Sequence, residues 1–175
     1  CVSAANVGYF LLAVADSLAF AELANAISYF GSAYAVLAMV LIIADVCRME
    51  WKPWLHRSLN GISTAAFVLA ASGDLLGLYY TAVSIETVNG MTRLVKEYGP
   101  LHILYTLYLL GYILGMVGII RHAWKKQKLT SPKYTMLLML AVLLNLGVWA
   151  VEQAMDIDFE FLSVSYIVTE VFLLL

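Results

Sequence analysis

Three carboxyl groups that lie within apolar stretches are the residues of this chain best suited to bind a charged ligand. Asp74, Glu152 and Glu170 each stand in a run of mostly apolar residues, and no Lys or Arg is expected at the same depth. A carboxyl group without a counter-ion in such surroundings either stays protonated or meets a cation. Aromatic rings beside carboxylates attract ammonium groups through charge pairing and cation–π interaction. The pattern therefore predicts a pocket for a small cationic or amine-bearing molecule.

Other polar and aromatic side chains are expected at a similar depth, on several different helices. The predicted ligand-binding residues are Asp74, His102, Tyr105, Tyr108, Asn145, Trp149, Glu152, Tyr166 and Glu170. Ionisable groups in apolar segments usually face the interior of a helix bundle and mark function. The alternative interpretation is a core of neutral carboxylic acids, hydrogen-bonded to Asn145 and the tyrosines, that holds no ligand.

The composition is that of an integral membrane protein. The chain is 63% hydrophobic and 13% charged, with a mean hydropathy of +0.87, whereas soluble domains carry about a quarter charged residues. Its net charge of −2 is not that of a protein with a basic surface for nucleic acid. The sequence contains no HExxH, GxSxG or Walker motif and no Cys/His cluster of metal-ligand spacing. We therefore expect a non-catalytic domain without metal or cofactor.

The run from Pro100 to Ile120 shows how such groups are positioned. It contains no Asp, Glu, Lys or Arg, and a helix of this length spans the roughly 30 Å hydrocarbon core of a bilayer. His102 and the tyrosines that follow it fall on one stripe of the helix, within an arc of about 120°. Three glycines, Gly111, Gly115 and Gly118, form the neighbouring stripe. Because small residues allow helices to approach closely, we expect this stripe to pack against another helix.

The pattern predicts an all-α membrane protein with one domain, residues 1–175. Six transmembrane helices are expected at about residues 1–21, 23–47, 54–80, 100–124, 134–153 and 161–175. Between the third and fourth lies the only long polar connection, 81–99. Its Asn89-Gly90 pair, flanked by β-branched residues, predicts a small hairpin. This hairpin is expected to cover the pocket as a lid on the outer surface.

The distribution of basic residues predicts the orientation. Eight of the ten Lys and Arg residues fall in two segments, 48–57 and 121–133, and the other two are Arg93 and Lys96. Cytoplasmic loops carry the excess of positive charge. The two basic segments are therefore expected in the cytoplasm, and segment 81–99 outside the inner (cell) membrane.

Two runs resemble a bacterial seven-helix sensor region found at the N-terminus of histidine kinases, diguanylate cyclases and DNA-binding regulators. The first is AELANAISYFGSAYAVLAMVLIIADVCRM, which is similar to a helix with the pattern A-K-x-x-x-x-L-x-Y-x-G. The second is DLLGLYYTAVSIETVNGMTRLVKEYGPLHILYTLYLLGYILGMV, which looks like the outer loop and "YGPL" helix of that region. The resemblance implies seven helices, so this chain would be a fragment without the first helix, the end of the last and the output domain.

The resemblance implies a receptor-like sensor whose final helix passes a signal to a cytoplasmic kinase, cyclase or other output domain. Two other classes of function are consistent with the residues. A transporter or channel component requires polar residues through the inner half of the membrane, which is mostly apolar here. A structural membrane anchor would form a homodimer through the glycine stripe. The lipid bilayer and a small molecule are the other expected partners.

Overall fold

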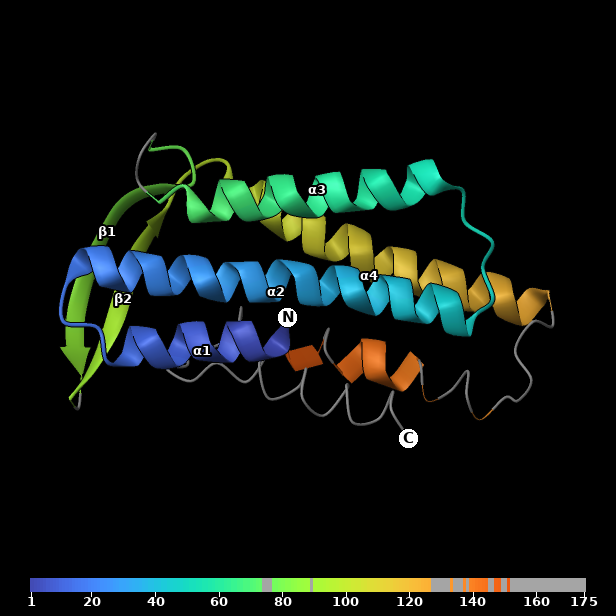
Figure 1. Ribbon diagram of the computed structural model, residues 1–175, viewed down its shortest axis with the longest axis horizontal. Coiled ribbons are helices and arrows are strands. Elements are labelled where there is room, and N and C mark those ends of the chain that lie inside the picture. Colours follow the sequence, from blue (N-terminus) through green and yellow to red (C-terminus); the bar gives the residue numbers. More distant parts are fainter. Residues whose placement is uncertain are drawn as a thin grey trace. The chain divides into compact units, whose positions relative to one another are not determined.

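The computed structural model describes residues 1–73, 77–88 and 90–126, together with 133, 137, 139–144, 147, 148 and 151. The part described up to residue 126 contains four helices and one hairpin (Figure 1). The elements are α1 (Val2–Ala13), α2 (Leu18–Val46), α3 (Pro53–Ala71), β1 (Tyr80–Val88), β2 (Met91–Tyr98) and α4 (His102–Lys125). Residues 139–144 are also helical, within the expected fifth helix. The expected sixth helix lies outside the described residues.

Two of the described helices are long and apolar enough to cross a membrane. Helix α2 has 29 residues and α4 has 24, with mean hydropathies of 2.0 and 2.1. At 1.5 Å per residue these correspond to about 43 and 36 Å. The predicted fold is thus confirmed only in part: the structure is mostly helical with two candidate spans, and a bundle of six transmembrane helices is not shown.

The first two helices are divided at a different place from the one expected. Helix α1 ends at Ala13 and α2 begins at Leu18, so the break is not near Glu22. The Ser17 carbonyl accepts the Ala21 N–H at 2.9 Å and thereby starts the hydrogen-bond ladder of α2. The polar pair before Leu18, Asp16 and Ser17, suits a helix start. Glu22 consequently lies within α2, on the second turn.

Helices α1 and α2 pack with their backbones in direct contact at two glycines. A Cβ placed on Gly8 would lie 2.7 Å from the Cα of Ser28 and would also overlap its amide nitrogen. A Cβ on Gly31 would lie 2.6 Å from the Cα of Ala5 and would overlap the nitrogen of that residue. Real Cβ atoms do not approach backbone so closely. The helix pair therefore depends on the absence of a side chain at both positions.

The third helix is shorter than expected. Helix α3 ends at Ala71 rather than near Tyr80. Its last turn is closed by Ser72, whose N–H and hydroxyl both bond to the Leu69 carbonyl. Gly73 follows with φ of +59°, the left-handed conformation in which helices commonly end. Tyr80 then opens the first strand instead of closing the helix.

The hairpin predicted from the Asn89-Gly90 pair is confirmed. Strands β1 and β2 are antiparallel, with Val88 opposite Met91. Gly90 has φ of +80°, as two-residue hairpin turns require. At the open end the Gly99 N–H bonds to the Tyr79 carbonyl at 2.8 Å, which continues the ladder beyond the strands. Helix α4 begins three residues later.

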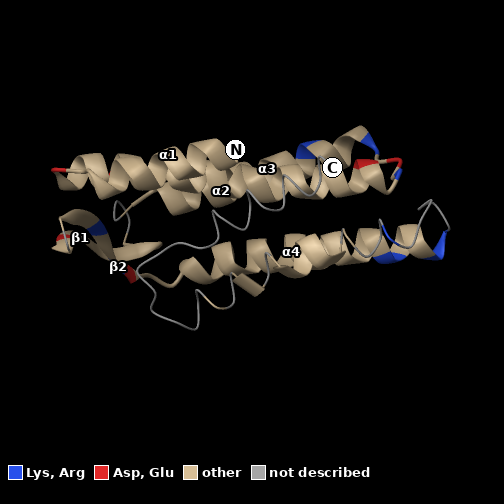
Figure 2. Ribbon diagram, turned by 90° about the horizontal axis from the view of Figure 1, so that it is seen from below, with Lys and Arg blue, Asp and Glu red and all other residues tan. Residues whose placement is uncertain are grey.

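The chain divides into two units, each of which is described separately. The first comprises Cys1–Leu37 and Pro53–Leu109, and the second comprises Ala38–Lys52 and Leu110–Leu175. In the second unit, α2 buries Ile43 and α4 buries Met116 and Ile120. Figure 2 shows that the middle parts of α2 and α4 carry no Lys, Arg, Asp or Glu. All residues of the candidate site belong to the first unit.

Candidate functional site

Strand β2 attaches the hairpin to the helices through alternate residues. Thr92, Leu94 and Lys96 face the same way because successive strand residues point to opposite faces. The Thr92 hydroxyl donates to the Ala15 carbonyl at 2.6 Å. Leu94 is 6% exposed and packs with Ala15 and Ala21. The hairpin is thus fixed over the connection between α1 and α2.

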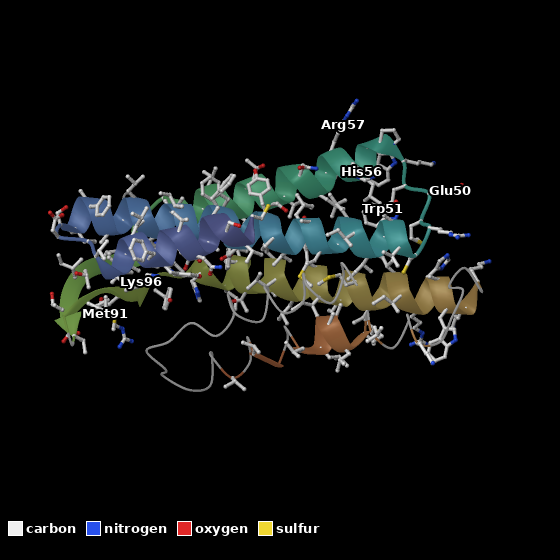
Figure 3. All side chains as sticks on the ribbon, turned by 60° about the horizontal axis from the view of Figure 1, so that its bottom comes forward. Glu50, Trp51, His56, Arg57, Met91 and Lys96 are labelled. Carbon is white, nitrogen blue, oxygen red and sulfur yellow. The ribbon has the colours of Figure 1, made fainter. Side chains whose placement is uncertain are left out.

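Lys96 is the third residue of this row and lies in a site built for an ammonium group. Its Nζ donates to Asn25 Oδ1 at 2.8 Å. It also lies 5.5 Å from the centre of the Tyr29 ring and 5.9 Å from that of Tyr80. Figure 3 labels Lys96 on the hairpin, and Met91 at the tip of the same hairpin. The chain therefore provides its own cation at an amide and two aromatic rings.

A cavity of about 210 Å³ lies beside this lysine site, between the start of α2, the end of α3 and the hairpin. Its lining includes Glu22, Asn25, Ser72, Tyr80, Val83 and Leu94. Polar groups thus come from α2, from Ser72 just after α3 and from β1, and the aliphatic side chains of Val83 and Leu94 come from the hairpin. Small-molecule sites have this construction, an apolar wall with a few placed polar groups.

Seven aromatic rings form a continuous group at the base of the hairpin, which we call the tyrosine cluster. Its members are Tyr29, Tyr79, Tyr80, Tyr98, His102, Tyr105 and Tyr108. Neighbouring ring centres lie between 4.0 Å, for Tyr98 and His102, and 6.4 Å, for Tyr79 and Tyr105. Several pairs meet edge to face, the arrangement that aromatic rings favour. The cluster joins α2, β1, β2 and α4 through one set of contacts.

Tyr79 lies at the centre of the tyrosine cluster. It is fully buried, and its hydroxyl forms no hydrogen bond with the described residues. Burial raises the pKa of Tyr79 well above its ordinary value, and the neighbouring Tyr80 raises it further. The phenol therefore stays neutral at physiological pH.

Tyr108 connects three helices by hydrogen bonds. Its hydroxyl donates to the Ala33 carbonyl of α2 at 2.8 Å. Since the phenol has a single proton, Ser63 Oγ of α3 is the donor in the second bond, at 3.1 Å. Tyr108 and Ser63 are both buried, at 7% and 0% exposure.

Replacing Tyr108 by phenylalanine is expected to lower the free energy of unfolding by about 1–3 kcal/mol, because both buried hydrogen bonds are lost. The matched control is Tyr34→Phe, which removes one bond to Thr64 at the exposed surface. Thermal unfolding of the detergent-solubilised protein measures the difference. Equal destabilisation by the two changes would contradict a special role for Tyr108.

The structure brings together three of the nine predicted ligand-binding residues. His102, Tyr105 and Tyr108 belong to the tyrosine cluster, and the last two are 7% exposed. Their stripe on α4 therefore faces protein, as its spacing indicates. The other six, Asp74, Asn145, Trp149, Glu152, Tyr166 and Glu170, lie outside the described residues. The convergence of the three carboxyls remains a prediction.

The glycine stripe of α4 finds no partner among the described residues. A Cβ placed on Gly111, Gly115 or Gly118 would meet nothing within 4 Å in that part of the chain. All three positions are exposed there. Packing through this stripe therefore also remains a prediction. The close helix contacts that the structure does contain are made by Gly8 and Gly31.

Three important residues of the site, Asn25, Tyr29 and Lys96, were not among the predicted ones. Lys96 falls in the expected outer loop, where a lysine is ordinarily solvated. The sequence pattern that could have predicted its position is the alternation of Thr92, Leu94 and Lys96, which places the lysine on the buried side of the hairpin.

A family model describes the whole of this chain. The N-terminal 7TM region of histidine kinases matches residues 1–175. No curated protein matches the chain, and neither does any solved structure. The match agrees with the two long apolar helices and identifies a membrane domain, with catalysis left to other domains of such kinases. The chain therefore belongs to the family of N-terminal 7TM regions of histidine kinases.

Proposed function

We propose that this domain is a sensor that binds a small molecule in the cavity beneath the hairpin and passes the signal through its last helix to a cytoplasmic output domain. The observation that carries the proposal is the position of the cavity. Its walls come from α2, α3 and the hairpin. The tyrosine cluster joins α2 and the hairpin to α4, and the hydrogen bond between Ser63 and Tyr108 joins α3 to α4. A ligand that changes the docking of the hairpin would therefore act on the helices.

We propose further that the hairpin lies outside the inner membrane and that the basic segments 48–57 and 121–133 lie in the cytoplasm. The charge distribution supports this orientation, because most Lys and Arg residues fall in those two segments. In this orientation the cavity opens toward the exterior. A homodimer through the exposed glycine stripe of α4 is consistent with the signalling role.

The ligand class inferred from the sequence is a small cationic or amine-bearing molecule. The Glu22 carboxylate, which lines the cavity, supports an amine-bearing ligand, whereas the ammonium position at Asn25 is taken by Lys96 itself. A transporter would require a polar path through the inner half of the membrane. The described inner parts of α2 and α4 are largely apolar, which favours a sensor.

Labelling of the hairpin tip tests the proposed function. Met91 is 59% exposed, so Met91→Cys, in a Cys1→Ser background, offers a reactive thiol while Cys47 stays fully buried. On intact cells a bulky, membrane-impermeant maleimide should react with it. The modification should change the autophosphorylation rate of the full-length protein by about fivefold or more, a typical allosteric coupling.

Lys133→Cys, at an exposed position in the basic segment, is the control and should react only in opened cells. Reaction of Lys133→Cys but not Met91→Cys on intact cells would overturn the orientation. Complete labelling of Met91→Cys without any change in rate would favour the structural anchor over the sensor.

A further inference from the structure

Asn25 is a buried residue whose side-chain N–H groups indicate a specific kind of ligand. The residue is 7% exposed and lines the cavity. An ammonium group can only donate, so the atom that faces Lys96 must be the amide oxygen. The amide nitrogen is therefore turned away from the lysine. Its two N–H groups form no hydrogen bond within the described part of the chain, and they suit an acceptor oxygen.

The lysine behind Asn25 favours a negatively charged acceptor. Lys96 polarises the amide through its 2.8 Å hydrogen bond and makes the N–H groups stronger donors. Hydrogen bonds to an ionised acceptor are shorter and about twice as strong as neutral ones. A carboxylate oxygen therefore forms a stronger hydrogen bond with the Asn25 N–H groups than a hydroxyl or a neutral carbonyl does.

The cavity has a negative end where Glu22 approaches the C-terminus of α3. Glu22 Oε1 lies 3.8 Å from the position of a Cβ on Gly73, and both residues line the cavity. The carboxylate of Glu22 has no ion pair with the described residues. The last carbonyl groups of a helix also lack intrahelical partners and carry the negative end of the helix dipole.

The volume of the cavity is sufficient for a small molecule. About 210 Å³ corresponds to roughly seven water molecules at about 30 Å³ each. Val83 and Leu94 supply an apolar wall. The cavity therefore matches a molecule of a few heavy atoms that has a carboxylate, an ammonium group and a short aliphatic part.

We propose that this cavity binds a small zwitterion of the free amino acid class, with its carboxylate on the Asn25 amide and its ammonium group between Glu22 and the C-terminal end of α3. This inference rests on the proposed sensor function and specifies its ligand. It also assigns Lys96 a positioning role, because the lysine fixes the orientation of the Asn25 amide. Glu22 and Asn25 are then the residues that select for the two charges.

Calorimetric titration of the full-length protein in lipid nanodiscs tests the assignment. The probes are L-alanine, L-serine and L-threonine, together with ethanolamine, which lacks the carboxylate, and propionate, which lacks the amine. At least one of the three amino acids should bind about tenfold or more tightly than either partial molecule, a difference of about 1.4 kcal/mol.

Two variants test the carboxylate and the ammonium group of the ligand separately. Asn25→Asp keeps the size of the side chain and forms an ion pair with Lys96, so the fold should persist, but a carboxylate now faces that of the ligand. Amino acid binding should fall at least tenfold, while ethanolamine binding is retained. Glu22→Gln should weaken the binding of all four amine-bearing probes, the three amino acids and ethanolamine. Glu86→Gln, at an exposed position of β1, is the control and should change none of these affinities.

Three results would overturn the assignment. They are ethanolamine binding as tightly as the amino acids, amino acid binding that Asn25→Asp leaves unchanged, and failure of all three amino acids to bind the wild-type protein. The sensor function is judged separately, by the effect of the hairpin label on autophosphorylation. A response to that label without amino acid binding would leave a sensor with another ligand.

Discussion

Replacing Gly31 by alanine is expected to destabilise the first unit by at least about 1–3 kcal/mol, the usual cost of overpacking. The added methyl group would overlap the nitrogen of Ala5 and lie 2.6 Å from its Cα. These are backbone atoms of α1, which no change of rotamer can move away. Leucine at the same position should prevent α1 from docking. In the other helix, the methyl group added by Gly8→Ala would overlap the backbone of Ser28, so this change should also destabilise the first unit.

Gly61→Ala is the matched control for this prediction. Gly61 lies inside α3, is exposed, and would meet nothing within 4 Å among the described residues. Since alanine is favoured over glycine in a helix interior by about 1 kcal/mol, this change should stabilise the protein slightly. Thermal unfolding in detergent should therefore shift in opposite directions for the two variants. Equal shifts would show that α1 and α2 do not need direct backbone contact.

Features determined by local sequence were predictable. The Asn89-Gly90 pair specified a two-residue hairpin turn, and Val88 is indeed paired with Met91. The apolar run after Pro100 specified a long helix, and the spacing of Tyr105 and Tyr108 specified its buried stripe. In each case the signal is contained within a few neighbouring residues, because turn geometry and helical periodicity are local properties.

Features that depend on contacts between distant residues were not predictable. The close approach of α1 and α2 needs Gly8 and Gly31, but the apolar residues of both helices are spread around the helix axis, so the sequence does not indicate which faces meet. The α1–α2 boundary was misplaced for the same reason, since apolar residues continue past Asp16 and Ser17. The helix predicted up to Tyr80 ended early because Gly73 adopts a positive φ, which a glycine permits but does not require.

The candidate site was only partly predictable because the cation at its centre, Lys96, belongs to strand β2 and not to a helix. The predicted pocket depended on the absence of Lys and Arg at its depth. The hairpin instead folds back over the helices and places Lys96 against Asn25, 71 positions away in the sequence. The interaction of an ammonium group with aromatic rings was foreseen. The structure shows that Lys96 already makes this interaction, with Tyr29 and Tyr80.

Replacing Lys96 by methionine is expected to release the hairpin from the helices. The change keeps most of the length of the side chain but removes the hydrogen bond to Asn25 and the attraction to the Tyr29 and Tyr80 rings. Loss of a hydrogen bond to a charged donor costs about 1.5–3 kcal/mol, and each cation–π contact contributes about 0.5–2 kcal/mol. Local opening of residues 80–98 should therefore become at least tenfold more frequent.

Hydrogen–deuterium exchange of the hairpin amides measures this opening. Arg93→Met is the matched control, since it removes the same charge from the exposed row of β2, three residues away. It should leave exchange at the base of the hairpin near the wild-type rate. Lys96→Arg, which keeps a cation over the rings, should restore part of the protection. If Arg93→Met and Lys96→Met accelerate exchange equally, the effect is due to net charge and Lys96 does not anchor the hairpin.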